Sequence, residues 1–205
     1  GEIYNYLSLA KKYKIKLNTK CDTEFLLKVY IQEGSKIINE LNGMFAFVIL
    51  DKVTNEIFVA RDRLGEKPLY YYKKKNKVIF SSELSVIRYI ANINDFNEVG
   101  LRQYKKLRTC FKDNTIFKNI NIMPAGYFLK NDKLEQYWNI DFTCDQEKIN
   151  AEKLKYLIED AVSIRMISDR TIGTYLSGGL DSTLVTQLAQ HYSSKPLNSF
   201  TIGFI

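Results

Sequence analysis

The stretch from Thr171 to Val185 constrains the fold of this chain more than any other. Its first part, 172–176, is apolar and rich in residues that favour β-structure, and a second apolar run, 180–188, has the spacing of a helix. A Ser-Gly-Gly sequence at 177–179 separates the two runs. The stretch therefore predicts a strand, a tight glycine turn and a helix in direct succession.

Such a junction is a ready anion-binding site, because backbone N–H groups at a helix N-terminus are unpaired and the helix dipole favours negative charge there. Gly178 and Gly179 carry no side chain that would hold a ligand away from the backbone, and Ser177 and Ser182 can donate hydroxyls to phosphate oxygens. The carboxylate of Asp181 would repel a polyphosphate. A functional role for Asp181 therefore implies an intervening cation, most simply Mg²⁺ that keeps several waters.

Two other loop types do not fit the residues 177–182. A Walker loop needs a lysine, and none occurs between Ser177 and Ser182. A nucleophile elbow needs glycine two residues before the serine, whereas Gly173 stands four before it. The stretch Ser-Gly-Gly-Leu-Asp-Ser resembles the pyrophosphate-binding loop of the ATP pyrophosphatases, which adenylate a substrate and release pyrophosphate. A glycine turn with no ligand is the alternative interpretation.

Composition limits the classes of protein that remain. With 205 residues and 45% apolar content the chain can form a real core in one or two domains. It has no apolar run of about 18 residues, so we expect no membrane span. The net charge of +7 comes from dispersed lysines, which we interpret as solvated surface and not as a nucleic-acid site. The N-terminus has no initiating Met and no signal-peptide pattern, and we expect it to be a cut end.

The cysteines predict neither zinc nor a disulfide framework. Cys21, Cys110 and Cys144 are far apart and odd in number, and His191 is the single histidine. A reducing cytoplasm is the expected setting.

Hydrophobic patterns along the chain predict two kinds of architecture. Helices are expected at 4–13, 22–33 and 83–91, and hairpins from strand 41–50 with 56–60 and from strand 69–72 with 78–81. This succession is typical of an α+β layered domain with antiparallel sheets. A helix at 150–167, the strand, turn and helix described above, and a last strand at 197–204 then predict an α/β unit. Its strands would be parallel, with ligand at their carboxyl ends.

A second resemblance covers the first part of the chain. Gly-Met-Phe-Ala-Phe at 43–47, Ala-Arg-Asp-Arg-Leu-Gly-Glu-Lys-Pro-Leu-Tyr-Tyr at 60–71, and the stretches 80–83, 115–126 and 136–138 resemble the glutaminase domain of glutamine-dependent asparagine synthetases. The resemblance implies an N-terminal-nucleophile-type layered glutaminase domain at 1–145 and the start of an ATP pyrophosphatase domain at 146–205, both truncated. The alternative interpretation of 61–68 is a turn held by local ion pairs, which we favour for Arg63 and Lys67.

The resemblance also implies a glutamine site. Gly1 and Glu2 match the end of the family's Asn-Gly-Glu stretch, and Asp22 matches an aspartate that would accept from the α-ammonium group of glutamine. Asp22 also fits a plain helix cap, and both roles can hold together. The family's nucleophilic cysteine would lie upstream of Gly1, so no catalytic residue is assigned. Cys21 cannot replace it, because the mechanism uses the chain's own α-amino group as base.

On the synthetase side the resemblance assigns the nucleotide site to one loop and one strand. Asp181 would also contact the metal ion, and Leu176 and Ile202 fit ordinary strand core equally well. The aspartate-binding motifs would lie beyond Ile205. The ATP and pyrophosphate contacts that the resemblance implies are Leu176, Ser177, Gly178, Gly179, Leu180, Asp181, Ser182 and Ile202.

These assignments predict part of an asparagine synthetase. The complete enzyme would make asparagine from aspartate, ATP and glutamine through a β-aspartyl-adenylate, with Mg²⁺, in the cytoplasm and as a homodimer. One alternative is a related amidotransferase that acts on another carboxylate, such as a surface polysaccharide precursor. Another is a non-catalytic fragment. We expect no nucleic-acid or membrane partner, and no turnover by these 205 residues alone.

Overall fold

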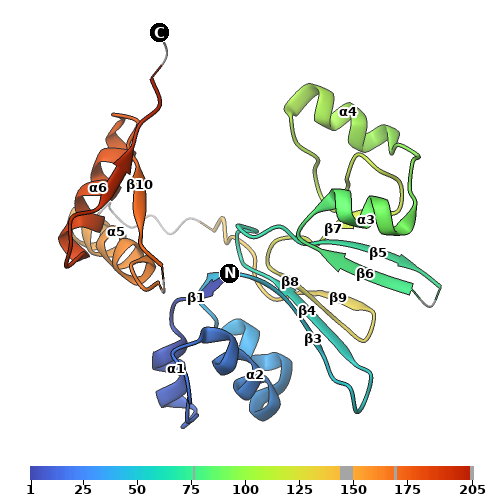
Figure 1. Cartoon of the computed structure of the whole chain (residues 1–205), viewed down its shortest axis with the longest axis horizontal. Helices are drawn as coiled ribbons and strands as arrows, with labels where there is room; N and C mark the ends of the chain where they lie inside the picture. Colours follow the sequence, from blue (N-terminus) through green and yellow to red (C-terminus); the bar gives the residue numbers. More distant parts are fainter. Residues whose placement is uncertain (76, 144–149, 169, 204–205) are drawn as a thin grey trace. The chain divides into compact units, whose positions relative to one another are not determined.

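The computed structural model describes residues 1–75, 77–143, 150–168 and 170–203. The chain divides into two compact units, Gly1–Asp141 and Phe142–Ile205, which are described separately (Figure 1). The boundary expected at 145/146 and Cys144 both lie outside the described residues, so the two domain ranges stay a prediction.

Two antiparallel sheets form the centre of the first unit. One has the order β3-β4-β8-β9 and the other β6-β5-β7. The strands of the first sheet are β3 (Ala46–Leu50), β4 (Ile57–Arg61), β8 (Tyr127–Lys130) and β9 (Lys133–Gln136). Those of the second are β5 (Tyr70–Lys74), β6 (Lys77–Ser81) and β7 (Ile120–Ile122).

Three hydrophobic clusters show how these sheets are layered. Phe58 and Ala60 of β4 pack with α1 (Tyr6–Lys12), α2 (Asp22–Glu33) and the 3₁₀ helix η1 (Gly34–Asn39). Val59 points to the other face and packs with Leu69 and Met123, as expected for alternation along a strand. On the second sheet, Tyr72 packs with Ile87 of α3 (Leu84–Ala91). The unit is therefore layered as helices, sheet, sheet and helix, which confirms the α+β prediction.

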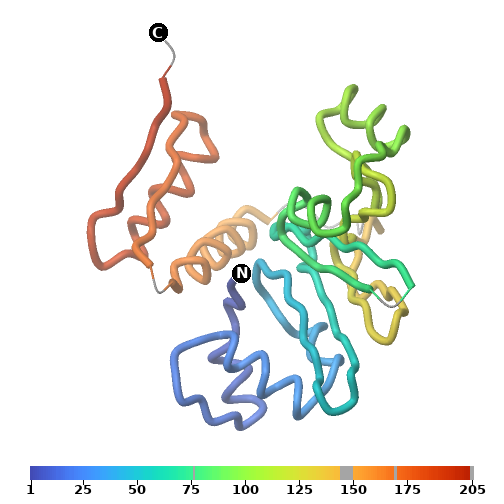
Figure 2. The backbone as a smooth tube through the Cα atoms, turned by 45° about the vertical axis from the view of Figure 1, so that its right-hand side comes forward, coloured from blue at the N-terminus to red at the C-terminus, as the bar shows by residue number. Residues whose placement is uncertain are grey.

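The second unit is a small βαβ arrangement preceded by a helix, drawn in orange and red in Figure 2. It contains α5 (Ala151–Arg165), β10 (Gly173–Tyr175), α6 (Leu180–Tyr192) and β11 (Asn198–Phe200). β10 and β11 are parallel, with Gly173 opposite Asn198 and Tyr175 opposite Phe200. The predicted strand, turn, helix and parallel strand are confirmed, although β11 is shorter than the predicted 197–204 and residue 204 lies outside the described residues.

The structure differs from the predicted elements at three places. The strand expected at 41–50 is interrupted at Phe45, which separates β2 (Gly43–Met44) from β3. The helix for which Asp22 was the candidate cap is preceded instead by Cys21, and no side chain caps it. Strand β1 (Glu2–Ile3), η1, helix α4 (Glu98–Leu107) and strands β7 to β9 were not predicted. In the described part of the chain, no helix is long and apolar enough to cross a membrane.

Candidate functional site

The first unit brings its three predicted glutamine contacts together. Glu2 and Ile3 form strand β1, and Asp22 is the first residue of α2. The N–H of Ile3 donates to Oδ2 of Asp22 over 2.8 Å, so the carboxylate is tied to β1 and not to the helix's own N–H groups. Asp22 is half-buried and Gly1 is exposed. The interpretation of Asp22 as a plain helix cap is wrong; its role toward glutamine stays a prediction.

The backbones of β1 and β2 approach each other closely at Gly1 and Gly43. Glu2 pairs with Met44 and Ile3 with Gly43. A Cβ added to Gly43 would lie 2.1 Å from the Glu2 carbonyl oxygen, and one added to Gly1 would lie 2.7 Å from the Met44 carbonyl oxygen. Only glycine allows these approaches. Gly43 therefore supports the site although it was not predicted to, and the signal available was its position in the Gly-Met-Phe-Ala-Phe stretch.

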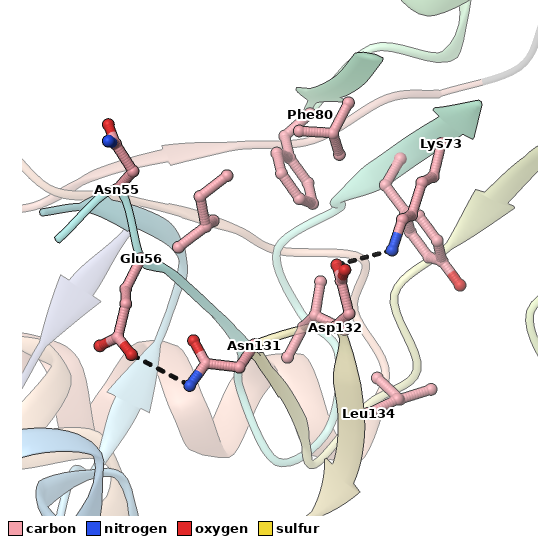
Figure 3. A pocket seen from close by; sticks show the side chains of 11 residues that line it. Asn55, Glu56, Lys73, Phe80, Asn131, Asp132 and Leu134 are labelled. Atoms are coloured by element: carbon pink, nitrogen blue, oxygen red, sulfur yellow. Dashed lines mark hydrogen bonds and ion pairs between the residues drawn. The ribbon is translucent and has the colours of Figure 1, made fainter. Parts of the chain in front are cut away.

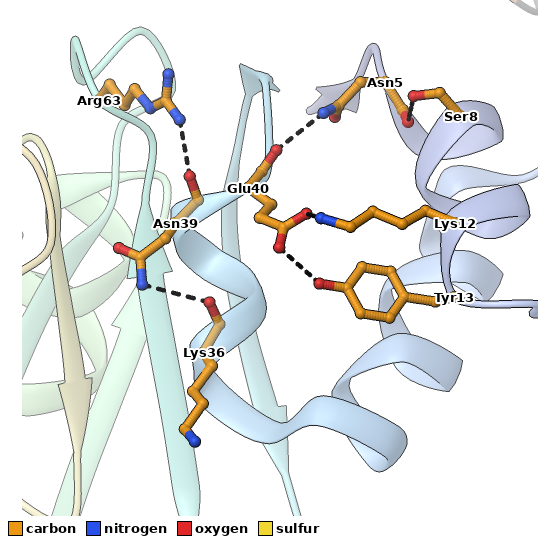
Figure 4. Close-up of polar contacts among 8 residues, drawn as sticks. All are labelled: Asn5, Ser8, Lys12, Tyr13, Lys36, Asn39, Glu40 and Arg63. Atoms are coloured by element: carbon orange, nitrogen blue, oxygen red, sulfur yellow. Dashed lines mark hydrogen bonds and ion pairs between the residues drawn. The ribbon is translucent and has the colours of Figure 1, made fainter.

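Polar contacts fix the helices beside β1 (Figure 4). The Glu40 carboxylate accepts from Lys12 Nζ over 2.5 Å and from Tyr13 Oη over 2.6 Å. The hydrogen bond from Lys12, followed by that from Tyr13, lowers the pKa of Glu40. Asn5 Nδ2 donates to the Glu40 carbonyl oxygen over 2.8 Å, and Arg63 donates to the Asn39 carbonyl oxygen over 3.0 Å. The turn that follows η1 is thus joined to α1 and to the 61–67 loop.

Hydrogen bonds between charged side chains and backbone groups hold the loop at 61–67 in the described residues. The local ion pairs favoured for Arg63 and Lys67 stay a prediction. The guanidinium of Arg61 is almost buried and donates to the carbonyl oxygens of Gly65, Lys67 and Met123 over 2.6–2.7 Å. Burial lowers the pKa of Arg61 from its ordinary value, and the nearby Asp62 partly opposes this. The Arg63 side chain donates to the Asn39 carbonyl oxygen, and Lys67 contributes its backbone N–H to Asp62 and its carbonyl oxygen to Arg61.

Glu24, in the first turn of α2, makes hydrogen bonds whose contribution to stability depends on pH. Hydrogen bonds from Lys28, then Thr19, then Asn18 lower its pKa from 4.5 to about 2. Because the folded-state value is depressed, the stability it supplies is complete above about pH 4.5 and is lost as the pH falls toward about 2. We expect Glu24→Gln to flatten the fall of Tm between these two pH values. Thermal unfolding at a series of pH values measures this. If the fall of Tm with pH is the same in Glu24→Gln as in the parent chain, the assignment is contradicted.

In the second unit the predicted phosphate loop connects β10 to α6. Ser177 Oγ and Ser182 Oγ lie 3.0 Å apart, and Ser182 Oγ donates to the Gly179 carbonyl oxygen over 3.1 Å. The Ser177 N–H donates to Ser182 Oγ over 3.3 Å. Both hydroxyls therefore lie on the same side of the turn, at the start of the helix. This places two hydroxyl donors beside the helix N-terminus.

The backbone of this loop is open. Gly178 has φ of +82°, and no atom lies within 4 Å of where its Cβ would be. No side chain caps α6 at Gly179. Leu180 and Ile202 are 84% and 80% exposed, so Ile202 is not strand core as its alternative interpretation held. Leu176 is half-buried, and its N–H donates to the Phe200 carbonyl oxygen over 2.9 Å.

Thr201 is a member of this site that the sequence did not single out. Its Oγ1 donates to the Leu176 carbonyl oxygen over 2.6 Å. This contact joins the ends of both strands, directly before the loop. Position at a strand end was the only signal that could have identified Thr201.

Asp181 and the start of α6 suit a cation that is bound together with a phosphate group. Asp181 lies exposed in the first turn of α6. Among the described residues, no group of three or more His, Cys, Asp or Glu side chains could hold a metal ion. One carboxylate beside an open helix N-terminus suits Mg²⁺, which is usually bound by one or two carboxylates, substrate phosphates and waters.

Replacing Gly178 by Ala tests the loop conformation. At φ of +82° an L-residue is strained, so we expect a loss of about 1–2 kcal/mol of unfolding free energy. Urea unfolding measures it. Gly203→Ala is the matched control, because Gly203 lies in the same unit with no atom within 4 Å of an added Cβ and no positive φ. Equal stability of the two variants would contradict the strained geometry.

Two cavities elsewhere in the described residues lack convergent chemistry. One of about 460 Å³ lies between the two sheets of the first unit, where Lys73 pairs with Asp132 over 2.6 Å and Glu56 accepts from Asn131 over 3.1 Å (Figure 3). The other, about 520 Å³, is a mainly apolar groove between α5 and α6. The paired charges of the first are largely exposed, which makes the contact worth little.

Comparisons with known proteins agree with both units. The family model for the glutamine amidotransferase domain matches residues 1–138, and the model for asparagine synthase matches residues 153–205. The protein named glutamine-hydrolysing asparagine synthetase 2 of Methanocaldococcus jannaschii is 41% identical to this chain. The match covers the whole of this chain and 42% of that protein. Asparagine synthetase 3 of Bacillus subtilis is 32% identical, and the match covers the whole of this chain and 36% of that protein.

The chain thus spans about two fifths of the length of these curated relatives. The glutamine amidotransferase match alone covers more than half of the chain, and it includes both β1 and Asp22. On this match, the chain belongs to the glutamine amidotransferase domain family.

Proposed function

We propose that this chain is part of a glutamine-hydrolysing asparagine synthetase. The observation that carries the proposal is the open Ser177–Ser182 loop at the start of α6, on a chain whose first unit belongs to the glutamine amidotransferase domain family. Residues 1–145 would form the glutaminase part and residues 146–205 the beginning of the synthetase part. Relatives named for asparagine synthesis support the pairing of these two parts.

In the first unit, Gly1, Glu2 and Asp22 would hold glutamine. The Asp22 carboxylate already accepts from Ile3 N–H through Oδ2, which orients the group. Its other oxygen, Oδ1, has one long contact of 3.4 Å with Thr23 Oγ1 and would accept from the α-ammonium group of glutamine. Hydrolysis of the side-chain amide of glutamine would then supply ammonia.

In the second unit, the Ser177–Ser182 loop would hold the phosphates of ATP. The N–H groups at the start of α6 and the hydroxyls of Ser177 and Ser182 would stabilise the charge that develops on departing pyrophosphate. Asp181 would hold Mg²⁺, which when bound neutralises phosphate charge. The adenosine would lie near Leu176 and Ile202, where the exposed Ile202 side chain offers apolar contact.

The reaction needs this loop because a carboxylate oxygen is a poor leaving group. The aspartate side-chain oxygen would attack the α-phosphorus of ATP and pyrophosphate would leave. Ammonia would then attack the carbonyl carbon of the adenylate, AMP would leave with the former carboxylate oxygen, and asparagine would form. Adenylation thus converts the carboxylate into a group that ammonia can displace.

The test uses a chimera in which this chain replaces the matched segment of the M. jannaschii relative, which restores that relative's full length. The assay is acceptor-dependent pyrophosphate release with ATP, Mg²⁺ and ammonium, offered aspartate or a panel of sugar acids. Release with aspartate alone is expected. The acceptor pocket of the chimera comes from the relative, so the assay tests the nucleotide loop of this chain and not its choice of acceptor. No release with any acid, from a folded chimera, would refute the synthetase assignment.

A further inference from the structure

Asp62 is a fully buried carboxylate with an unusual number of backbone partners. Oδ1 accepts from the N–H groups of Leu64 over 3.1 Å and Glu66 over 2.9 Å. Oδ2 accepts from Lys67 N–H over 3.0 Å and from Phe45 N–H over 3.2 Å. Three of these donors are local, and Phe45 is the one that is distant in sequence. The carboxylate therefore joins the 61–67 loop to the chain at Phe45.

Phe45 is the point at which one extended segment changes partners. Before it, β2 pairs with β1; after it, β3 pairs with β4. Asp62 follows the last residue of β4 and exchanges two contacts with Phe45, since the Asp62 N–H also donates to the Phe45 carbonyl oxygen over 2.8 Å. The side chain thus takes the place of a strand partner for the Phe45 N–H. This allows β2 to leave the sheet and run along β1.

The direction given to β2 determines the position of the candidate glutamine site. A Cβ on Gly1 would lie 2.7 Å from the Met44 carbonyl oxygen and 2.9 Å from Phe45 Cα, so Gly1 rests directly on the residues that Asp62 holds. The N–H of Tyr4 donates to the Asn42 carbonyl oxygen over 2.8 Å, on the other side of the β1–β2 pair. A shift of Phe45 would therefore move the whole pair relative to Asp22.

The loop around Asp62 is built to keep a buried charge. Arg61 donates to carbonyl oxygens of the same loop, including those of Gly65 and Lys67, whereas Asp62 accepts from its N–H groups. The two opposite charges thus share one loop, and each is satisfied by backbone groups. Such a buried and fully hydrogen-bonded arrangement is rigid, because breaking any part of it leaves a charge uncompensated.

We propose that Asp62 is a positioning residue for glutamine, which acts through Phe45 and β2 to hold Gly1 and Glu2 in place. The inference rests on the proposed glutamine site for its ligand. Its geometric part, the dependence of the β1–β2 pair on Asp62, is independent of that site. It can be measured without any ligand.

The experiment compares Asp62→Asn with the parent 205-residue chain by amide hydrogen exchange and by calorimetric titration with glutamine. The Asn side chain turns an NH₂ group toward donors that Asp62 satisfies. We expect the Ile3 and Tyr4 amides to exchange at least about 10-fold faster and glutamine to bind at least about 10-fold more weakly. Amides of the buried α2 residues Phe25 and Val29 should keep their protection, which shows that the unit remains folded.

Asp51→Asn is the matched control. Asp51 also accepts two backbone N–H bonds in a turn, from Val53 over 2.8 Å and Thr54 over 3.2 Å, but at the opposite end of the β3–β4 hairpin. It should leave the exchange of Ile3 and Tyr4 and the affinity for glutamine unchanged. A folded Asp62→Asn variant with the same exchange and affinity as the parent would overturn the proposal.

Two further outcomes are decisive. If Asp62→Asn does not fold, native-state hydrogen exchange of the parent chain decides. A common opening free energy for the amides of Phe45, Glu66 and Tyr4 supports the coupling of Asp62 to β1. Opening of the Tyr4 amide at a different free energy overturns it. If the parent does not bind glutamine while exchange of Ile3 and Tyr4 still depends on Asp62, the glutamine site fails and the coupling of Asp62 to β1 stands.

Discussion

Replacing Arg61 by Met is expected to lower the free energy of unfolding of the chain by about 5 kcal/mol. Arg61 is only 9% exposed, and its guanidinium donates to the carbonyl oxygens of Gly65, Lys67 and Met123. Each hydrogen bond from a charged donor contributes about 1.5–3 kcal/mol, and a buried acceptor that loses its partner has an additional desolvation cost. Methionine fills similar space but donates nothing. The substitution also removes the positive charge of Arg61, which interacts with the buried Asp62 carboxylate.

Urea unfolding followed by circular dichroism measures this effect. Arg63→Met is the matched control, because Arg63 lies in the same loop and has one hydrogen bond to the Asn39 carbonyl oxygen. We expect it to lower the free energy of unfolding by about 1 kcal/mol. Similar losses in the two variants would mean that the loop is held by something other than the Arg61 contacts.

This contrast shows where sequence patterns were informative. The run at 172–188 combined β-favouring residues, a glycine turn and helical spacing, and each signal is local, so β10, the turn and α6 were predicted correctly. The hairpin of β3 and β4 was predicted for the same reason. By contrast, the charges of the 61–67 loop gave no hint that they would bond to backbone groups as distant as Met123.

The local signals of the elements that were not predicted are less specific. Helix α4 has a largely polar surface with basic residues in its last turn, and its clearest marker is Asn97, whose side chain accepts from Val99 and Gly100. An Asn-Glu cap before a weakly apolar segment can equally begin a loop. The interruption at Phe45 is harder still, because a continuous apolar run contains no sign that Asp62 will divide it into two strands.

The candidate sites follow the same rule. The Ser177–Ser182 loop is contiguous, so its residue types predicted a phosphate site directly. The glutamine cluster depends on a contact between Ile3 and Asp22, 19 residues apart, and was reached through resemblance instead. Gly43 and Thr201 were not singled out, since each supports its site through a backbone contact with a distant segment.

Replacing Asp181 by Ala in the chimera is expected to lower Mg²⁺-dependent pyrophosphate release on the order of 100-fold or more while glutaminase activity is retained. The proposed role of Asp181 is to hold the cation against the phosphates, at the exposed first turn of α6. Without it the cation would be held by phosphate and water alone. The glutaminase reaction uses the other unit, whose residues are unchanged. Pyrophosphate release and glutamine-to-glutamate conversion are measured on the same preparations.

The control must separate this role from helix stability, because an acidic residue in the first turn of a helix contributes about 0.3–1 kcal/mol through the dipole. Glu152 holds the corresponding place in α5. Glu152→Ala should therefore cause a similar small loss of stability and leave pyrophosphate release near that of the unchanged chimera. If Asp181→Ala also left synthesis intact, or if added Mg²⁺ had no effect on the unchanged chimera, the assignment of Asp181 to the cation would be wrong. Loss of both activities together would mean that the substitution disturbs folding, and that Asp181 has no separate chemical role.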